Sequence, residues 1–183
     1  MYRSYPMSRP RKASSKATQQ PVPTHLRTRA GRVESAMVDT SAKAPTARTA
    51  VARAVVQFPP GLLTRLLAEG GPKGPIGEVA RLAGIAAAKR TDELIPLCHS
   101  LPLDWVDVVL EQLSATELEV RCTARTRAAT GVEMEAMVGA SMAALTVYDM
   151  SKGLDKGVLL GRVELVEKSG GKSGLWRRAG TQK

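Results

Sequence analysis

The longest predicted helix carries charged side chains at both of its ends. Small and apolar residues over positions 132–153 predict this helix, with Glu133 and Glu135 at its start and Asp149 and Lys152 near its end. With a rise of about 1.5 Å and a rotation of about 100° per residue, Glu135 and Asp149 lie within about 40° around the helix but about 21 Å apart along it. If both residues act in one small site, a second subunit must bring the opposite end of its own helix close, as a two-fold interface permits.

These charges also have a purely structural explanation. Acids near a helix N-terminus and lysines near its C-terminus complement the helix macrodipole. Asp149 and Lys152 are three residues apart, a spacing that often gives a surface ion pair. A lysine beside an anionic substrate can equally serve as an acid or a base. Spacing alone leaves both interpretations open.

A second candidate site is the tripeptide Leu97-Cys98-His99, which follows Pro96 in a predicted turn between a helix and a strand. His99 is either an ordinary turn histidine or a phosphate contact or proton-transfer group, because imidazole titrates near neutral pH. A Cys–His nucleophilic pair is disfavoured, because adjacent residues in an extended chain point in opposite directions. Cys98 and Cys122 are also too few and too far apart for a disulfide scaffold or a paired-thiolate zinc site.

Two glycine-rich segments carry lysines. Lys73 lies in the segment GGPKG (residues 70–74), which is either a mobile loop over a phosphate or a turn in solvent. The segment SGGKS (residues 169–173) contains the Gly-Lys-Ser of a phosphate loop. Val166 stands where that motif requires glycine, and no helix is predicted after it. The second segment is therefore not a Walker motif.

The elements that position these residues alternate little between strand and helix. Leu118, Val120, Cys122 and Ala124 alternate with polar residues, which predicts a strand with one wet face and makes Cys122 a core residue. A short connection at 114–115 predicts an antiparallel hairpin. The segregation of strands and helices predicts an α+β fold with an antiparallel sheet and helices on one face. The predicted strands span 51–58, 104–113, 117–126 and 157–167, and the predicted helices span 62–67, 76–94 and 132–153.

The positive charge is concentrated at the N-terminus. Of the net charge of +10, residues 1–33 supply +8 and contain no Asp or Glu, so residues 34–183 carry only +2. The first segment is rich in Pro, Ser and Arg, which predicts a disordered extension before a single domain at 34–183. A mitochondrial transit peptide is less favoured, because prolines interrupt any amphipathic helix. We predict no membrane span, no secretion signal and a cytoplasmic location, since no apolar run is long enough to span a bilayer.

Several segments together resemble a known family. These segments are MVDTS (37–41), KRTDELIPLCH (89–99), GVEMEA (131–136), ALTVYDM (144–150) and EKSGGKSG (167–174). With them, the chain resembles cyclic pyranopterin monophosphate synthases over about residues 37–174, and MVDTS corresponds to the family's first strand. Two mild departures are Ser100, where proline is usual, and Ser151, which often corresponds to cysteine.

This resemblance implies a reaction, an assembly and a set of site residues. The family converts a cyclised dihydro-GTP to a pyranopterin with a cyclic phosphate, releasing diphosphate, in molybdenum cofactor biosynthesis. It implies a ferredoxin-like subunit, a homohexamer built as a trimer of dimers with sites at the dimer interface, and no metal or redox cofactor, although Mg²⁺ can accompany the triphosphate. The implied catalytic residues are Asp149, as the acid, and Lys152 and Lys73, as acid/base lysines. The implied substrate-binding residues are Leu97, Cys98, His99, Glu133, Met134 and Glu135, with Arg48 as a triphosphate contact.

Two alternatives belong to other classes of protein. The net charge alone supports a basic RNA-binding module, which should lose affinity when residues 1–33 are removed, whereas an enzyme should retain turnover. The second alternative is a noncatalytic subunit of an assembly. We predict the enzyme, with no nucleic-acid or membrane partner.

Overall fold

The computed structural model describes residues 25–180, and the chain divides into two compact units, Met1–Ala36 and Met37–Lys183. The described part of the first unit is an antiparallel hairpin of β1 (Leu26–Arg29) and β2 (Arg32–Ser35). Ala30 and Gly31 between the strands both have positive φ, as a tight hairpin turn requires. The expectation of disorder is therefore wrong for residues 26–33, and the expected division after residue 33 falls inside β2. Residues 1–24 lie outside the described part of the chain.

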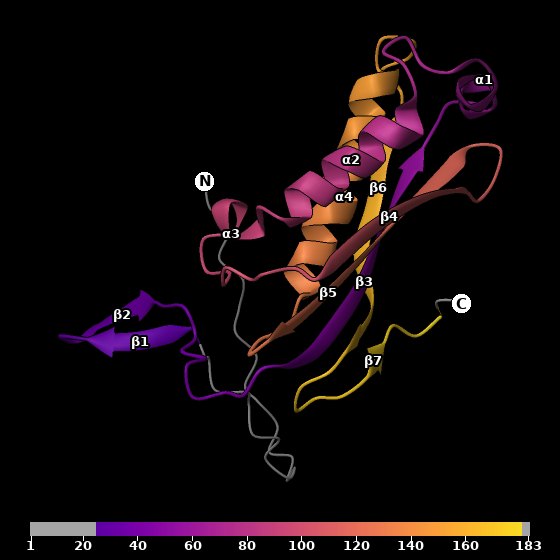
Figure 1. Ribbon diagram of the computed structural model, residues 1–183. Coiled ribbons are helices and arrows are strands. Elements are labelled where there is room, and N and C mark those ends of the chain that lie inside the picture. The colour runs from indigo at the N-terminus through magenta and orange to yellow at the C-terminus, as the bar shows by residue number, and fades with distance from the viewer. Residues whose placement is uncertain (1–24, 181–183) are drawn as a thin grey trace, which may run out of the picture. The chain divides into compact units, whose positions relative to one another are not determined.

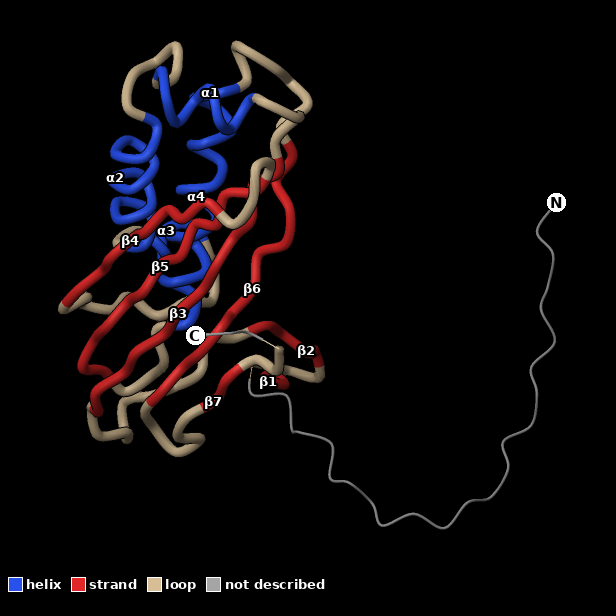
Figure 2. The backbone as a smooth tube through the Cα atoms, turned by 90° about the vertical axis from the view of Figure 1, so that its right-hand side faces the viewer, coloured by secondary structure: helices blue, strands red, loops and turns tan. Residues whose placement is uncertain are grey.

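The second unit is a five-stranded antiparallel sheet in the order β4-β5-β3-β6-β7, with helices α2 and α4 on one face (Figures 1 and 2). This arrangement confirms the expected α+β, ferredoxin-like architecture and the predicted hairpin, which is β4 followed by β5. The strands are β3 (Thr46–Gln57), β4 (Trp105–Gln112), β5 (Glu117–Ala128), β6 (Leu159–Ser169) and β7 (Trp176–Arg177). The helices are α1 (Leu62–Glu69), α2 (Ile76–Ala88), α3 (Thr91–Leu94) and α4 (Glu133–Ser151).

The core lies between the sheet and the helices, and small residues allow the layers to approach closely. A Cβ added to Gly84 of α2 would lie 2.9 Å from the carbonyl oxygen of Gly139 in α4, so these helices meet backbone to backbone. Cys122 is fully buried beneath α4, as the alternation in β5 predicts. The sheet contributes Ala50, Ala52, Ala54, Val56, Leu118, Val120 and Ala124 to this core, and α4 contributes Ala136, Ala140, Ala143, Ala144 and Val147.

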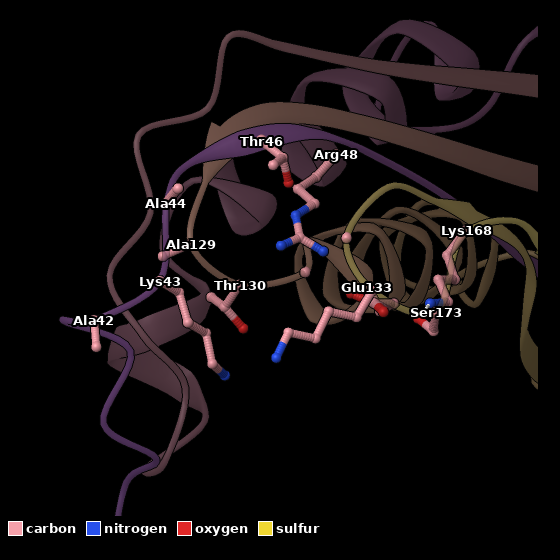
Figure 3. A pocket seen from close by; sticks show the side chains of 13 residues that line it. Ala42, Lys43, Ala44, Thr46, Arg48, Ala129, Thr130, Glu133, Lys168 and Ser173 are labelled. Atoms are coloured by element: carbon pink, nitrogen blue, oxygen red, sulfur yellow. Dashed lines mark hydrogen bonds between the residues drawn. The ribbon is translucent and has the colours of Figure 1, made fainter.

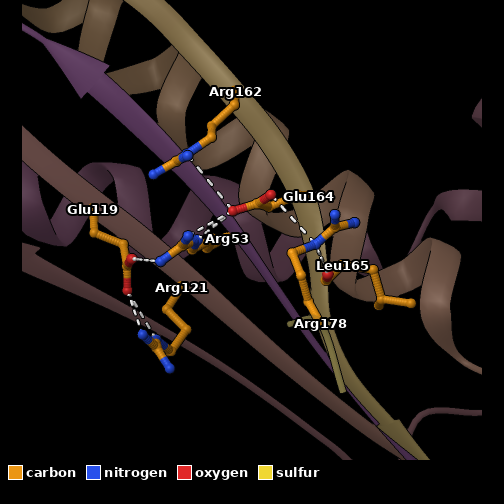
Figure 4. A network of polar contacts seen from close by, with 7 residues as sticks. All are labelled: Arg53, Glu119, Arg121, Arg162, Glu164, Leu165 and Arg178. Carbon is orange, nitrogen blue, oxygen red and sulfur yellow. Dashed lines mark hydrogen bonds and ion pairs between the residues drawn. The ribbon is translucent and has the colours of Figure 1, made fainter. Parts of the chain in front are cut away.

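The opposite face of the sheet carries a network of ion pairs (Figure 4). Arg53 of β3 lies between Glu119 of β5 and Glu164 of β6, with N–O distances of 3.2 Å and 2.6 Å. Arg121 contacts Glu119 as well, and the Glu119 side chain is only 2% exposed. Because a buried carboxylate is costly without partners, these pairs favour the observed alignment of the three central strands.

Two predicted elements differ from the structure. The helix expected over 76–94 ends at Ala88 and is followed by the single turn α3, because Arg90 leaves helical geometry, with φ −117° and ψ 22°, and its N–H bonds to the Ala87 carbonyl three residues back. Residues 37–41, matched to a first strand, are irregular, because the Asp39 carboxylate accepts a hydrogen bond from the Ser41 backbone N–H and turns the chain. Within residues 25–180, no helix is both long and apolar enough to cross a membrane.

Candidate functional site

Lys73, Asp149 and Lys152 form one cluster at the C-terminal end of α4. Lys73 comes from the loop between α1 and α2, and its Nζ lies 2.6 Å from Asp149 Oδ2. Lys152 Nζ lies 2.7 Å from Asp149 Oδ1, and all three side chains are about half exposed. The structure thus brings the three residues together, although Lys73 is 76 residues from Asp149 in the sequence.

The charges in this cluster determine its resting protonation. Hydrogen bonds from Lys152 and then Lys73 lower the pKa of Asp149 to about 2. The same carboxylate raises the pKa of Lys152. At neutral pH, Asp149 is therefore ionised and holds no proton to donate, whereas Lys152 is a cation that can donate one. Asp149 is better suited to orienting the lysines than to the acid role that the resemblance implies.

Cys98 and Glu135 meet at the N-terminal end of α4. Glu135 is only 3% exposed, and Cys98 Sγ lies 3.9 Å from its Oε1. Burial raises the pKa of Glu135, and the nearby charge of Glu133 adds to this effect. Burial and the charge of Glu135 also raise the pKa of the Cys98 thiol, which disfavours the nucleophilic thiolate. Among the described residues, Glu135 Oε2 is a buried oxygen without a hydrogen-bond partner in the subunit.

The remaining residues predicted for this end of α4 are His99, Leu97 and Met134. His99 Nε2 lies 2.7 Å from the Val38 carbonyl oxygen, so Nε2 carries the proton and donates it, leaving Nδ1 for another partner. The irregular segment at 37–41 thus orients His99. Leu97 and Met134 are both more than a third exposed, at 37% and 39%.

The buried carboxyl predicts a pH-dependent stability. The pKa of Glu135 is raised in the folded state. Its contribution to the free energy of unfolding is therefore fully present below the ordinary glutamate pKa and is lost as the pH rises through the folded-state pKa. Glu135→Gln stays neutral, so we expect it to be more stable than the wild type at pH 8 by on the order of 1 kcal/mol, with the difference vanishing near pH 4. Urea unfolding at both pH values measures this. Equal stability of the two proteins at pH 8 would contradict an uncompensated charge at Glu135.

A basic pocket of about 770 Å³ adjoins the N-terminal end of α4 (Figure 3). The start of β3, the segment before α4 and the glycine-rich loop after β6 form its walls. Its charged lining consists of four cations and one acid, an excess of three positive charges that suits a polyanionic ligand. The lining residues are Ala42, Lys43, Ala44, Thr46, Arg48, Ala129, Thr130, Gly131, Glu133, Lys168, Gly171, Lys172 and Ser173.

Sequence reasoning found Arg48 and Glu133 of this pocket but missed Lys43, Lys168 and Lys172 as site residues. The sequence signal for Lys168 and Lys172 was the lysine-rich segment EKSGGKSG. This segment does not match a Walker motif, and its lysines were therefore not predicted as site residues. In the structure Lys168 Nζ contacts Ser173 Oγ across this loop. Among the described residues, no group of three or more His, Cys, Asp or Glu side chains is placed to hold a metal ion.

The two ends of α4 remain far apart within one subunit. The 14 residue steps from Glu135 to Asp149 span about 21 Å of helix axis. The exposed face between them is largely apolar: Leu145 is 46% exposed, Val138 and Met142 are partly exposed, and the hydroxyl of the exposed Ser141 donates to the Met137 carbonyl.

Comparisons with known proteins found a matching family and several similar sequences. The sequence model of the MoaC family matches residues 37–171. A cyclic pyranopterin monophosphate synthase of Pelobacter propionicus is 55% identical over 143 residues, covering 78% of this chain and 89% of that protein. The proteins of the same name from Bordetella avium and Thermomicrobium roseum are 52% and 50% identical, covering 77% and 85% of this chain and 88% and 92% of their own lengths.

Proposed function

The chain belongs to the MoaC family, and we propose that it works as a cyclic pyranopterin monophosphate synthase, a lyase of molybdenum cofactor biosynthesis. Its substrate is a cyclised dihydro-GTP, in which the ribose is bonded to the base, and its products are the cyclic pyranopterin monophosphate and diphosphate. The observation that carries this proposal is the basic pocket beside α4, with four cations against one acid, which matches the charge of a triphosphate.

The site is completed by a second subunit. The basic pocket and Glu135 lie at one end of α4, and the proton-donating Lys152 lies at the other. The largely apolar exposed face between them suits an isologous contact, in which an antiparallel copy of α4 places each end beside the opposite end of its partner. Three such dimers would form the homohexamer.

Each group then has a task in the reaction. The cations of the pocket bind the triphosphate and neutralise charge on the departing diphosphate. Ring opening and closure require protons to move, for which Lys152, Lys73 and His99 are available. When a sugar hydroxyl oxygen attacks the innermost phosphorus, its proton passes to a base, the new P–O bond closes the cyclic phosphate, and the P–O bond to diphosphate breaks. Glu135 Oε2 has no hydrogen-bond partner within the described part of the subunit, which supports a role for this carboxyl in binding the ring system.

These groups supply charge and protons from side chains alone, which supports a reaction without a resident metal or redox cofactor, with Mg²⁺ entering only on the triphosphate. A cytoplasmic location accords with this small-molecule chemistry. The names of the relatives give no support to the RNA-binding alternative.

One assay tests the proposal directly. The purified full chain is incubated with the cyclised substrate, and pterin fluorescence is followed after oxidation of the product. We expect turnover that requires Arg48 and Lys152. A chain that forms no pterin but binds RNA tightly would replace the enzyme by the RNA-binding alternative.

A further inference from the structure

The turn formed by Gly170 and Gly171 after β6 packs directly on Arg48. Both glycines have positive φ, 96° and 69°. A Cβ added to Gly171 would overlap the Arg48 guanidinium, at 2.6 Å from Cζ and 2.9 Å from Nη2. A Cβ added to Gly170 would overlap the Ala47 carbonyl oxygen and lie 3.1 Å from Arg48 Cδ. The guanidinium therefore lies against bare backbone, a surface that only glycine provides.

The turn bounds the part of Arg48 that enters the pocket. The Arg48 side chain projects from β3 into the space lined by Thr130, Glu133 and Lys168 (Figure 3). Its Nε donates to the Ala128 carbonyl oxygen at 3.4 Å, a long hydrogen bond that restrains the guanidinium only weakly. A planar guanidinium binds phosphate oxygens well only when its fork is aimed at them. The backbone of Gly170 and Gly171, which lies beside the guanidinium, therefore affects the affinity of Arg48 for phosphate.

We propose that the Gly170-Gly171 turn is a positioning element that holds the Arg48 guanidinium in the orientation that binds the substrate triphosphate. This inference rests on the proposed function, because it takes the basic pocket as the triphosphate site. It also gives the SGGKS segment a purpose other than that of a Walker motif. Its glycines admit an arginine side chain to close contact with the backbone, and that arginine contacts the phosphates.

The test replaces Gly171 by alanine in the full chain. Gly171→Ala should displace the guanidinium and weaken binding of inorganic triphosphate about tenfold, the size of one charge-assisted hydrogen bond. The KM for the substrate should rise by about the same factor while kcat changes less than about twofold, as loss of uniform binding requires. Gly174→Ala is the matched control, because Gly174 lies in the same loop with φ 59° and an added Cβ there meets no atom within 4 Å. It carries similar backbone strain and should bind triphosphate like the wild type.

A double-mutant cycle with Arg48→Ala separates positioning from general damage to the loop. If Gly171 acts through Arg48, Gly171→Ala should weaken triphosphate binding in the wild type and have no further effect in the Arg48→Ala protein. Equal losses in both backgrounds, or misfolding in both, would overturn the inference, as would normal binding by Gly171→Ala. Wild-type protein that binds no triphosphate would instead overturn the proposed site itself. Thermal unfolding of each variant identifies misfolding.

Discussion

A mixture of two inactive variants, Glu135→Ala and Asp149→Ala, should recover about a quarter of wild-type activity. In random pairing about half of the dimers contain one chain of each kind, and in each of these one of the two shared sites has both residues intact. The physical basis is the length of α4, which separates Glu135 from Asp149 by about 21 Å within a subunit. The measurement is turnover after subunit exchange, with exchange verified by two affinity tags.

The matched control mixes variants whose changes lie at the same end of α4. Asp149 and Lys152 contact each other within one chain, so Asp149→Ala mixed with Lys152→Ala leaves every shared site with one defect. This mixture should stay inactive. Recovery in the control, or none in the Glu135→Ala and Asp149→Ala mixture after verified exchange, would contradict a site built from opposite ends of two helices.

Lys152→Arg should retain substrate binding and lose turnover by about 10²-fold or more, the usual size of acid/base catalysis. The arginine keeps the positive charge and can still pair with Asp149, which lies 2.7 Å from Lys152 Nζ. Its guanidinium does not release a proton at neutral pH, so it can neither protonate nor deprotonate the substrate. Steady-state kcat and KM measure the effect. Because the pKa of Lys152 is raised by Asp149, Lys152 starts the proposed reaction as a cation.

Lys156→Arg is the matched control for this change. Lys156 is exposed and lies just beyond α4, so the same substitution should leave kcat and KM unchanged. Lys73→Arg should behave like Lys152→Arg, since Lys73 contacts the other oxygen of the same carboxylate. Near-normal turnover in both the Lys73 and Lys152 variants would reduce these lysines to electrostatic clamps and assign proton transfer to His99.

The local features of the fold were predictable from sequence because they depend on neighbouring residues. Alternation in β5 predicted its buried face and the burial of Cys122, and the spacing along 132–153 predicted α4 with opposite charges at its ends. The helix break at 89–90 was missed, because Ala-rich sequence continues the helical pattern across the point where Arg90 leaves helical geometry. The hairpin at 26–35 was missed as well, since its turn uses Ala30 at positive φ, a conformation rare for alanine.

The assembly of the site depended on contacts between residues far apart in the sequence. Spacing on α4 placed Asp149 beside Lys152, but only the tertiary structure brings Lys73 to the same carboxylate across 76 residues and Cys98 to Glu135 across 37. The contact of Gly171 with Arg48 likewise follows from the pairing of β6 with β3. Residue types and local periods determined which groups were available for chemistry. Strand register and helix packing decided which of them meet, because a shift of one residue in a strand turns every side chain to the other face.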